Sequence, residues 1–360
     1  MHAATRPRDP ARTSATCAAI LALLLPHRRA AEQGRRPGGD AYAEPDAVTD
    51  FPRQLDRLAH FVDRDEPVVF TLPAFPCKSP NPDKVLGRLP DEGERLSLAF
   101  LDRLCASIAR VHPPGARMLI CSDGHVFADL VNVPDPHVDA YADELRAIIA
   151  RDDLRHLGVL DLRDVRDGPR DVHGADTHER RRAWLHARHA PGVAQLRAQV
   201  RADEDALRLY RGITRFLFED AVDFPGTRSA LQRDCRTRAY GVIQRSRAWS
   251  GLIAERHPDA LRLSIHPQRR GAEKFGIRLL DTPDVWATPW HAAVLHGPDG
   301  RPHLLRRADA ARLGVLVHRD GRPSHFRQEP GERPSGRTAG SLGAGPGSSG
   351  HPREAGASAG

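Results

Sequence analysis

Residues 68–82 read VVFTLPAFPCKSPNP, an apolar run followed by a proline-rich loop. The run Val68–Leu72 has the β-branched and apolar composition of a buried strand. Prolines stop a strand and stiffen the loop that follows it. Because open α/β sheets bind ligands at the carboxyl ends of their strands, the loop at 73–82 is predicted to border a binding site.

This loop holds residue types that the chain otherwise avoids. The 360 residues include only three lysines, Lys78, Lys84 and Lys274, and two asparagines, Asn81 and Asn132, whereas every other Lys or Arg position is arginine. Lysine differs from arginine in being a compact amine whose protonation changes readily on burial. We therefore expect a functional role for Lys78, and for Lys84 we favour an ordinary surface position.

Apolar strands alternate with amphipathic helices along the first half of the chain. Helices are predicted to begin near residues 51 and 90 and to span 137–151, and strands are predicted at 68–72, 118–121 and 158–162. This alternation predicts an α/β fold with a Rossmann-like, mostly parallel sheet flanked by helices. No GxGxxG follows the first strand and no GxxxxGKS/T occurs, so neither a dinucleotide site nor a P-loop is supported.

The second half begins with a highly charged helical region, 175–222, which Tyr210-Arg211-Gly212 is expected to interrupt. The elements predicted after it are a helix over 240–253 and strands at 261–266 and 275–279. Segments 291–295 and 303–306 then predict a C-terminal β-hairpin extension.

The ends of the chain are polar and poor in apolar residues. Residues 1–14 and the Gly/Ser/Pro-rich residues 328–360 are expected to be disordered. Residues 15–327 are therefore predicted to form the folded domain, in which we propose a sub-boundary near residue 225. The apolar run Cys17–Leu25 resembles a signal peptide but lacks a clean cleavage site, so we interpret it as a first helix. No apolar run reaches the roughly 20 residues that span a bilayer.

Net charge and cysteine content argue against two classes of protein, those that bind nucleic acid and those that bind a metal through cysteines. The net charge is +7, but basic and acidic residues are interspersed, which favours a solvated surface over a nucleic-acid interface. The five cysteines show no metal-binding spacing. Reduced, buried thiols in a cytoplasmic protein are the expectation. A reactive Cys77, activated by the neighbouring Lys78, is the alternative.

Polar side chains follow several of the predicted strands and are expected to converge on one crevice. These candidates are Lys78, Ser79, Asn81, Ser122, Asp123, His266 and His291. Amine, hydroxyl, amide, carboxylate and imidazole groups together suit a polar, anionic, oxygen-rich substrate. Asp123 is either a general base or a turn residue, and each histidine is either catalytic or an ordinary strand end.

A clamp for a phosphate or carboxylate would need further cations. The candidates are Arg211, Arg245, Arg247 and Lys274. Arg245 and Arg247 lie two residues apart on a predicted helix and cannot share a face.

Seven strings, in order along residues 15–327, resemble the isocyanide (isonitrile) synthase family, which includes pyoverdine and dityrosine biosynthesis proteins. They are LPAFPCKSPNPDKVLGRLPDEGERLSL, HPPGARMLICSDGHVFADLVNVPD, YRGITRFL, QRSRAWSGLI, RLSIHPQ, EKFGIRLL and TPWHAAVL. The resemblance implies an enzyme that condenses the amine of an aromatic L-amino acid, tryptophan or tyrosine, with ribulose 5-phosphate. The sugar's C2 then becomes the isonitrile carbon, and neither a metal nor a nicotinamide cofactor is required.

The resemblance also implies a separate iron(II)/2-oxoglutarate oxygenase acting next on the product. It suggests Lys78, Asp123, His266 and His291 as acid–base candidates, with Lys78 alternatively holding the phosphate or the ketone oxygen. Ser79, Asn81 and Ser122 would bind sugar hydroxyls, and the four clamp candidates would bind the phosphate and the carboxylate. Competing readings are an enzyme that makes another N-modified amino acid, as in dityrosine pathways, and a non-catalytic binding protein.

Overall fold

The computed structural model describes residues 9–30, 50–165, 177–282 and 287–328. At its centre is a five-stranded sheet of order β3-β2-β1-β4-β5 in which every neighbouring pair is parallel. The strands are β1 (Val68–Leu72), β2 (Ala116–Cys121), β3 (Leu157–Leu160), β4 (Leu261–Ser264) and β5 (Phe275–Gly276). The prediction of an α/β fold with a mostly parallel sheet is confirmed.

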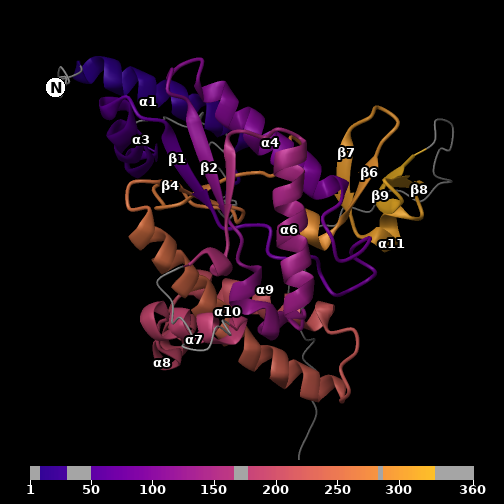
Figure 1. Ribbon diagram of the computed structural model, residues 1–360. Helices are drawn as coiled ribbons and strands as arrows, with labels where there is room; N and C mark the ends of the chain where they lie inside the picture. Colours follow the sequence, from indigo (N-terminus) through magenta and orange to yellow (C-terminus); the bar gives the residue numbers. More distant parts are fainter. Residues whose placement is uncertain (1–8, 31–49, 166–176, 283–286, 329–360) are drawn as a thin grey trace, which may run out of the picture.

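Four helices pack around this sheet (Figure 1). They are α1 (Pro10–Leu24), α3 (Pro52–Arg64), α4 (Glu92–Ile108) and α6 (Asp135–Arg151). Helix α3 contacts β1 and β4, and α4 contacts β2 and β3. Phe70 and Leu72 of β1 are completely buried, because the central strand is covered on both faces.

The first helix begins earlier than predicted. Asp9 caps α1 through its side chain, and the helix starts at Pro10, where proline is well tolerated. The expectation of disorder up to residue 14 is therefore wrong for residues 10–14, and residues 1–8 lie outside the described part. Cys17, Ile20 and Leu24 are buried in the main core, as expected of a first helix.

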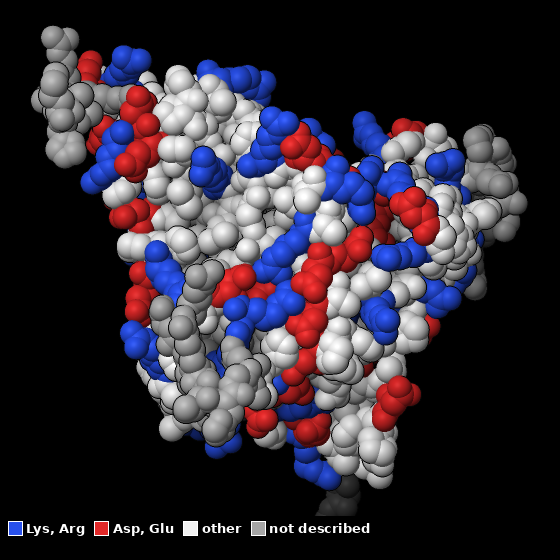
Figure 2. Space-filling view, viewed as in Figure 1, with Lys and Arg blue, Asp and Glu red and all other residues white. Residues whose placement is uncertain are grey.

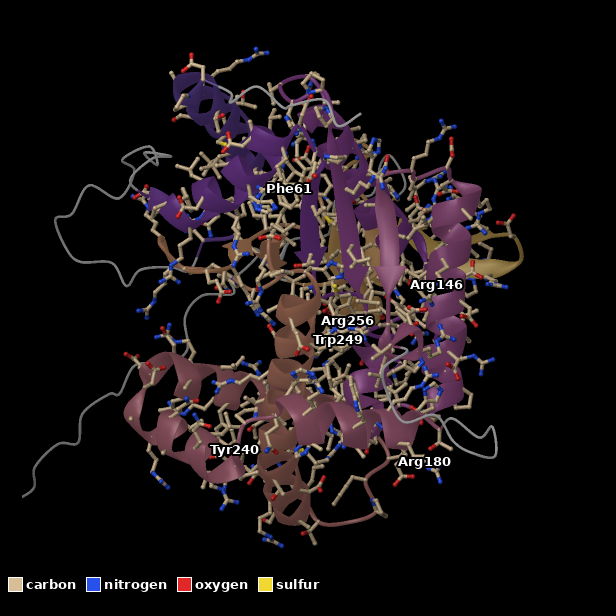
Figure 3. The ribbon with its side chains drawn as sticks, turned by 60° about the vertical axis from the view of Figure 1, so that its left-hand side comes forward. Phe61, Arg146, Arg180, Tyr240, Trp249 and Arg256 are labelled. Carbon is tan, nitrogen blue, oxygen red and sulfur yellow. The ribbon has the colours of Figure 1, made fainter. Side chains whose placement is uncertain are left out.

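A helical layer lies beyond the carboxyl ends of the strands, toward which the arrows of the sheet point (Figure 3). It consists of α7 (His178–His189), α8 (Val193–Ala202), α9 (Glu204–Asp220) and α10 (Arg228–Arg256). The indole Nε1 of Trp249 in α10 donates to the carbonyl of Cys121, 3.1 Å away, and so fixes this layer to the end of β2.

Helix α9 runs without interruption through residues 210–212, so the predicted break there is wrong. A single glycine lowers helix stability by only about 1 kcal/mol, which packing readily offsets. Residue 225 lies between α9 and α10, and the main core includes Leu217 before it and Leu231 after it. The proposed sub-boundary there stays a prediction.

A second sheet of four strands, ordered β7-β6-β9-β8, stands beside the first (Figure 1). Its strands are β6 (Ala293–His296), β7 (Pro302–Leu305), β8 (Val315–Arg319) and β9 (Arg322–Arg327), with α11 (Arg307–Ala310) between the two pairs. The predicted hairpin corresponds to β6 and β7. The β8–β9 hairpin was not predicted, although the apolar run Val315–Val317 and the Asp320-Gly321 turn signal it. Residues 329–360 lie outside the described ranges.

Short elements complete the described chain. They are α5 (Gly124–Phe127) and the 3-10 helices η1 (Leu25–His27), η2 (Ala128–Val131), η3 (Leu162–Asp164) and η4 (Pro289–His291). On the face shown in Figure 2, acidic and basic side chains are intermingled, as the sequence predicts. Among the described helices, none combines the length and apolar character needed to cross a membrane. All five cysteines are buried and free, which agrees with the predicted reduced thiols.

The loop after β1 is held in an unusual backbone conformation. Phe75 has φ +57°, a left-handed value that is rare for a bulky residue and has to be stabilised by its surroundings. Its ring is completely buried against Trp290, with ring centroids 5.3 Å apart, and its carbonyl accepts a hydrogen bond from Ser122. The next turn lies so close to α5 that a Cβ on Gly124 would be 1.9 Å from the Pro76 carbonyl oxygen.

Gly124→Ala is therefore expected to destabilise the protein by about 3 kcal/mol, because either the loop or α5 must move. Gly87→Ala is the matched control, since a Cβ there meets no atom within 4 Å; its stability should stay within about 1 kcal/mol of the wild type. Urea unfolding followed by circular dichroism measures both. Equal stability of the two variants would contradict the close approach of the loop to α5.

Candidate active site

Two of the predicted site residues follow strands that flank β1. Asp123 lies two residues after β2, where α5 begins, and His266 lies two residues after β4. Since β2 and β4 both pair with β1 in parallel, their carboxyl ends lie at the same edge of the sheet. Lys274 immediately precedes β5, the neighbour of β4, and its ammonium donates to the hydroxyl of Ser250 at 3.0 Å.

The pKa values of Asp123 and Lys274 are both shifted toward neutral pH. Burial raises the pKa of Asp123 to about 7, against the opposing effect of the Lys274 charge. Burial also lowers the pKa of Lys274 to about 8, helped by the charge of Arg262 and opposed by those of Glu273 and Asp123. A carboxyl and an amine with such pKa values can both hold and release protons near pH 7, as acid–base catalysis requires.

His266 lies beside the same charges. Burial by the surrounding protein, together with the positive charges of Arg29 and Lys274, lowers the pKa of its imidazole to about 4. The residue is nevertheless exposed to solvent. At pH 7 the ring is neutral, so it can donate one hydrogen bond and accept another.

Arg29 was not predicted as a site residue. Its Nη1 donates to the carbonyl of Ile265 at 2.5 Å, and its backbone N–H donates to the carbonyl of Gly276 at 2.8 Å. Glycine is needed at 276, because a Cβ there would lie 2.3 Å from the Arg29 carbonyl oxygen. No local pattern reveals this arrangement, since Arg29 and Ile265 are 236 residues apart.

His291 belongs to a second polar group with Lys84 and Asp220. The ammonium of Lys84 is 2.6 Å from Oδ1 of Asp220, and Nδ1 of His291 is 3.8 Å from Oδ2. Burial, then the charges of Lys84 and Lys78, lower the pKa of His291 to about 3, so its ring is neutral. The expectation that Lys84 is an ordinary surface residue is wrong, because the residue is buried in this ion pair.

The side chains of the three predicted hydroxyl and amide ligands all form hydrogen bonds within the protein. Ser79 accepts from the backbone N–H of Asn81 at 3.1 Å, and the amide of Asn81 donates to the Glu219 carbonyl at 2.8 Å. Ser122 is completely buried and donates to Phe75, so its hydroxyl holds the loop in place. These geometries favour a role in shaping the loop; sugar binding by Ser79, Asn81 and Ser122 stays a prediction.

Lys78 points away from Asp123. Its fully buried ammonium is 2.7 Å from Asp91, 2.8 Å from Glu94 and 3.0 Å from the Pro289 carbonyl. Burial alone would lower the pKa of Lys78, but the two carboxylates outweigh it and raise the pKa above the usual value. An ammonium held in this way is poorly suited to proton transfer, and the geometry favours a structural role for Lys78.

The predicted arginine clamp is not assembled. Arg245 pairs with Asp129, whereas Arg247 donates to Gln199 at 2.5 Å, so the two face different neighbours as their spacing implies. Arg211 is exposed on α9. Cys77 is buried, which raises the pKa of its thiol to about 12, so the geometry gives no support to a reactive thiolate.

Comparison with known proteins identifies the family. The sequence matches the profile of the pyoverdine/dityrosine biosynthesis proteins over residues 58–316. The chain belongs to this family. It is 45% identical to an L-tyrosine isonitrile synthase of Pseudomonas aeruginosa, over 86% of this chain and 93% of that protein.

Other proteins similar to this chain are also isonitrile synthases or carry the PvcA name. An L-tyrosine isonitrile synthase of Xenorhabdus nematophila is 43% identical, and an L-tryptophan isonitrile synthase of Fischerella ambigua is 40% identical, each over 76% of this chain and 81% of its own length. The crystal structure of the PvcA protein from Pseudomonas aeruginosa superposes with a TM-score of 0.78 at 44% identity, covering 87% of this chain and 100% of that one.

Lys78→Met is expected to destabilise this family member by about 3–5 kcal/mol, because it leaves two buried carboxylates without their counter-charge. Arg155→Met is the control: Arg155 forms an exposed pair with Asp153, which solvent screens, so its loss should leave the free energy of unfolding nearly unchanged. Urea unfolding at pH 7 compares them. A Lys78 variant as stable as the control would refute the structural role.

The shortage of lysines makes Lys274 directly measurable. Lys78 and Lys84 are buried in ion pairs, whereas Lys274 is partly exposed with a pKa lowered to about 8. An amine-reactive reagent should therefore modify Lys274 first, with a rate that is half-maximal near pH 8. Peptide mapping by mass spectrometry distinguishes it from the N-terminal amine. Faster labelling of Lys78 or Lys84 in the folded protein would contradict this assignment.

Proposed function

We propose that this protein is an isonitrile synthase that condenses the α-amine of an aromatic L-amino acid with ribulose 5-phosphate. In this reaction the nitrogen attacks the C2 ketone and water leaves. C2 then loses its bonds to C1 and C3, the rest of the sugar leaves as fragments and phosphate, and C2 ends as the isonitrile carbon. The observation that carries the proposal is the identity of 45% to an L-tyrosine isonitrile synthase along nearly the whole of that enzyme. The pKa values of Asp123 and Lys274, each shifted toward neutral pH, support it.

L-Tyrosine is the amino acid we propose. The relatives with the higher identities, 45% and 43%, are named as L-tyrosine enzymes, and those at 40% and 37% as L-tryptophan enzymes. A change between these two aromatic side chains needs only a few substitutions in a pocket, so identity orders the candidates without excluding tryptophan.

Proton transfer is assigned to Lys274. The amino acid arrives as an ammonium ion and must lose a proton before its nitrogen can attack a ketone. An amine whose pKa is about 8 can accept that proton in its neutral form and return it to the departing C2 oxygen as water forms. Asp123, which interacts electrostatically with Lys274, is placed to accept a hydrogen bond from the substrate amine.

We assign the sugar phosphate to the surroundings of Arg29 and His266. The positive charges of Arg29 and Lys274 both act on His266, so an anionic group bound there would be stabilised by two cations. The neutral ring of His266 can hydrogen-bond a sugar hydroxyl without adding charge. His291, also neutral, is a second candidate for holding a hydroxyl or moving its proton.

The setting of the reaction follows from its chemistry. An isonitrile of tyrosine keeps its carboxylate, and we propose that a separate iron(II)/2-oxoglutarate oxygenase acts on it in secondary metabolism. Residues 15–327 would form the catalytic domain. Five free, buried thiols are compatible with a reducing cytoplasm.

The test is incubation of the protein with ribulose 5-phosphate and, separately, L-tyrosine, L-tryptophan, L-phenylalanine and L-leucine. Trapping with a tetrazine and mass spectrometry should show an isonitrile, formed fastest from tyrosine, and with ribulose labelled by ¹³C at C2 the isonitrile carbon should carry the label. No isonitrile from any amino acid would refute the proposal. Another N-modified product would favour the dityrosine-type reaction, and binding without turnover would favour a binding protein.

Variants separate the roles of the lysines. Lys274→Met should lower kcat by on the order of 100-fold or more, because it removes the acid–base group. Lys274→Arg, which keeps the charge, should not restore it. A Lys274→Met variant with normal kcat would exclude acid–base work at this position while leaving the proposed activity intact.

A further inference from the structure

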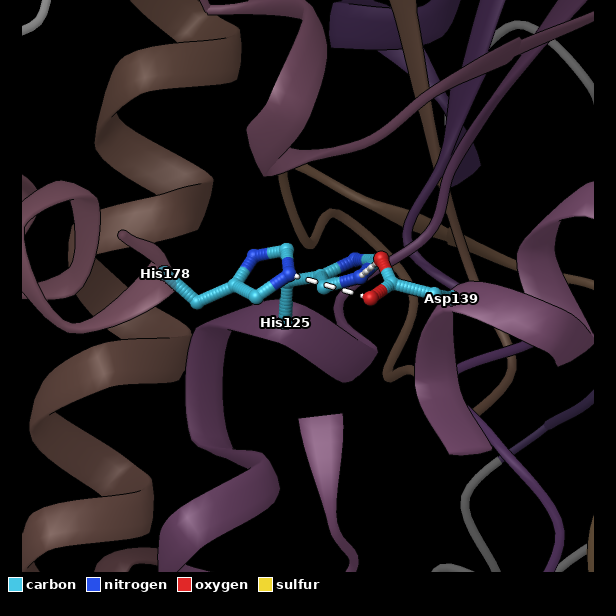
Figure 4. A group of neighbouring side chains, drawn as sticks. All are labelled: His125, Asp139 and His178. Carbon is cyan, nitrogen blue, oxygen red and sulfur yellow. Dashed lines mark hydrogen bonds and ion pairs between the residues drawn. The ribbon is translucent and has the colours of Figure 1, made fainter. Parts of the chain in front are cut away.

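Three side chains from three different helices meet on the side of α5 that faces α6 and α7 (Figure 4). Nε2 of His125 in α5 is 2.9 Å from one carboxylate oxygen of Asp139 in α6. Nε2 of His178, at the start of α7, is 3.2 Å from the other oxygen. The two imidazole rings are stacked with their centroids 4.6 Å apart. Both imidazoles thus hydrogen-bond the same carboxylate group, each through a different oxygen.

We propose that His125, Asp139 and His178 bind a divalent transition-metal ion, with zinc as the first candidate. Two imidazole nitrogens and one carboxylate form a common protein ligand set for zinc, which completes its coordination with water. Zinc lies about 2.0–2.2 Å from such atoms, so neighbouring ligand atoms are roughly 2.9–3.5 Å apart. The two nitrogen–oxygen separations here, 2.9 and 3.2 Å, fall in that range.

One ligand atom from each residue can be chosen so that all lie within 4.8 Å of one another, which is wider than the spacing around a bound zinc ion. Because the two rings are stacked with their planes 22° apart, they would have to turn toward each other to coordinate one ion. His125 is completely buried, and its Nδ1 has no hydrogen-bond partner in the described part of the chain. The ring is therefore held by packing and by Asp139 alone.

The charge around the cluster favours a cation. Asp139 is linked to Arg163, and through it to a chain of ion pairs with Asp143, Asp161, Arg146 and Asp164. Among the described residues this chain joins four carboxylates to two guanidinium groups, which leaves two negative charges. A divalent ion would balance them. Arg163 donates to Asp139 at 3.2 Å, a contact of the kind that orients a ligating carboxylate.

The position of the cluster suggests what the ion would do. Helix α5 follows Asp123, and Asp139 and His178 belong to the two helices that pack against it, α6 and α7. An ion bound by all three helices would fix α5, and with it the end of β2. We assign it a structural role, outside the proposed reaction.

The experiment uses full-length protein without a histidine tag, stripped of metal by dialysis against a chelator. Calorimetric titration with zinc chloride should show one ion per chain, and cobalt(II) should give the visible absorption of a low-symmetry site. His178→Ala and Asp139→Asn should bind zinc more weakly by a factor on the order of ten or more. Asp143→Asn is the control, since Asp143 also contacts Arg163 but is not a ligand.

Thermal melting provides the second readout. Zinc should raise the Tm of the wild type and of Asp143→Asn, but not that of His178→Ala, because only a folded site is stabilised by binding. If His178→Ala melts early even in chelator, His178→Gln replaces it. Failure of the wild type to bind zinc, or equal binding by all variants, would overturn the proposal. If the wild type does not bind zinc, His125 and His178 are simply two histidines that each form a hydrogen bond with Asp139.

Discussion

The ammonium of Lys78 holds together the parts from which this site is built. It connects the loop that leaves β1 to Asp91 and Glu94 at the start of α4, and to the Pro289 carbonyl just before His291. Glu94 also accepts from the hydroxyl of Tyr141 in α6 at 3.1 Å. Removing the ammonium from this buried group would leave two carboxylates without compensation, which is why the loop, α4 and α6 are expected to behave as one unit.

That unit fixes the geometry of the polar groups around it. Phe75 is kept in a left-handed conformation, and Gly124 is packed directly against Pro76, so Asp123 has little freedom to move. Proton transfer in the proposed reaction is assigned instead to Lys274, whose ammonium donates to the Ser250 hydroxyl. A lysine neutralised by two carboxylates and a lysine with a depressed pKa thus coexist in one protein, and their surroundings alone determine the difference.

The sequence predicted the sheet well, because its strands are short apolar runs bounded by proline and glycine. It also singled out Asp123 and His266 as acid–base candidates and Lys274 as a candidate anion ligand, and these roles stay predictions. It could not predict which lysine is buried among carboxylates. Lys84 looked like a surface residue and pairs with Asp220, 136 residues away. Arg29 and the His125–Asp139–His178 cluster were missed for the same reason: their partners come from distant segments, and no spacing along the chain records the contact.

The contact between Arg29 and β5 also constrains the order of assembly. The strand that receives the segment around Arg29 lies nearly 250 residues further along the chain, so their hydrogen bonds can form only after most of the protein has been synthesised. Long-range pairings of this kind form late, after other contacts have reduced the entropic cost of closing the loop. Arg29, whose charge helps to lower the pKa of His266, is therefore held at β5 only once the sheet closes at that edge.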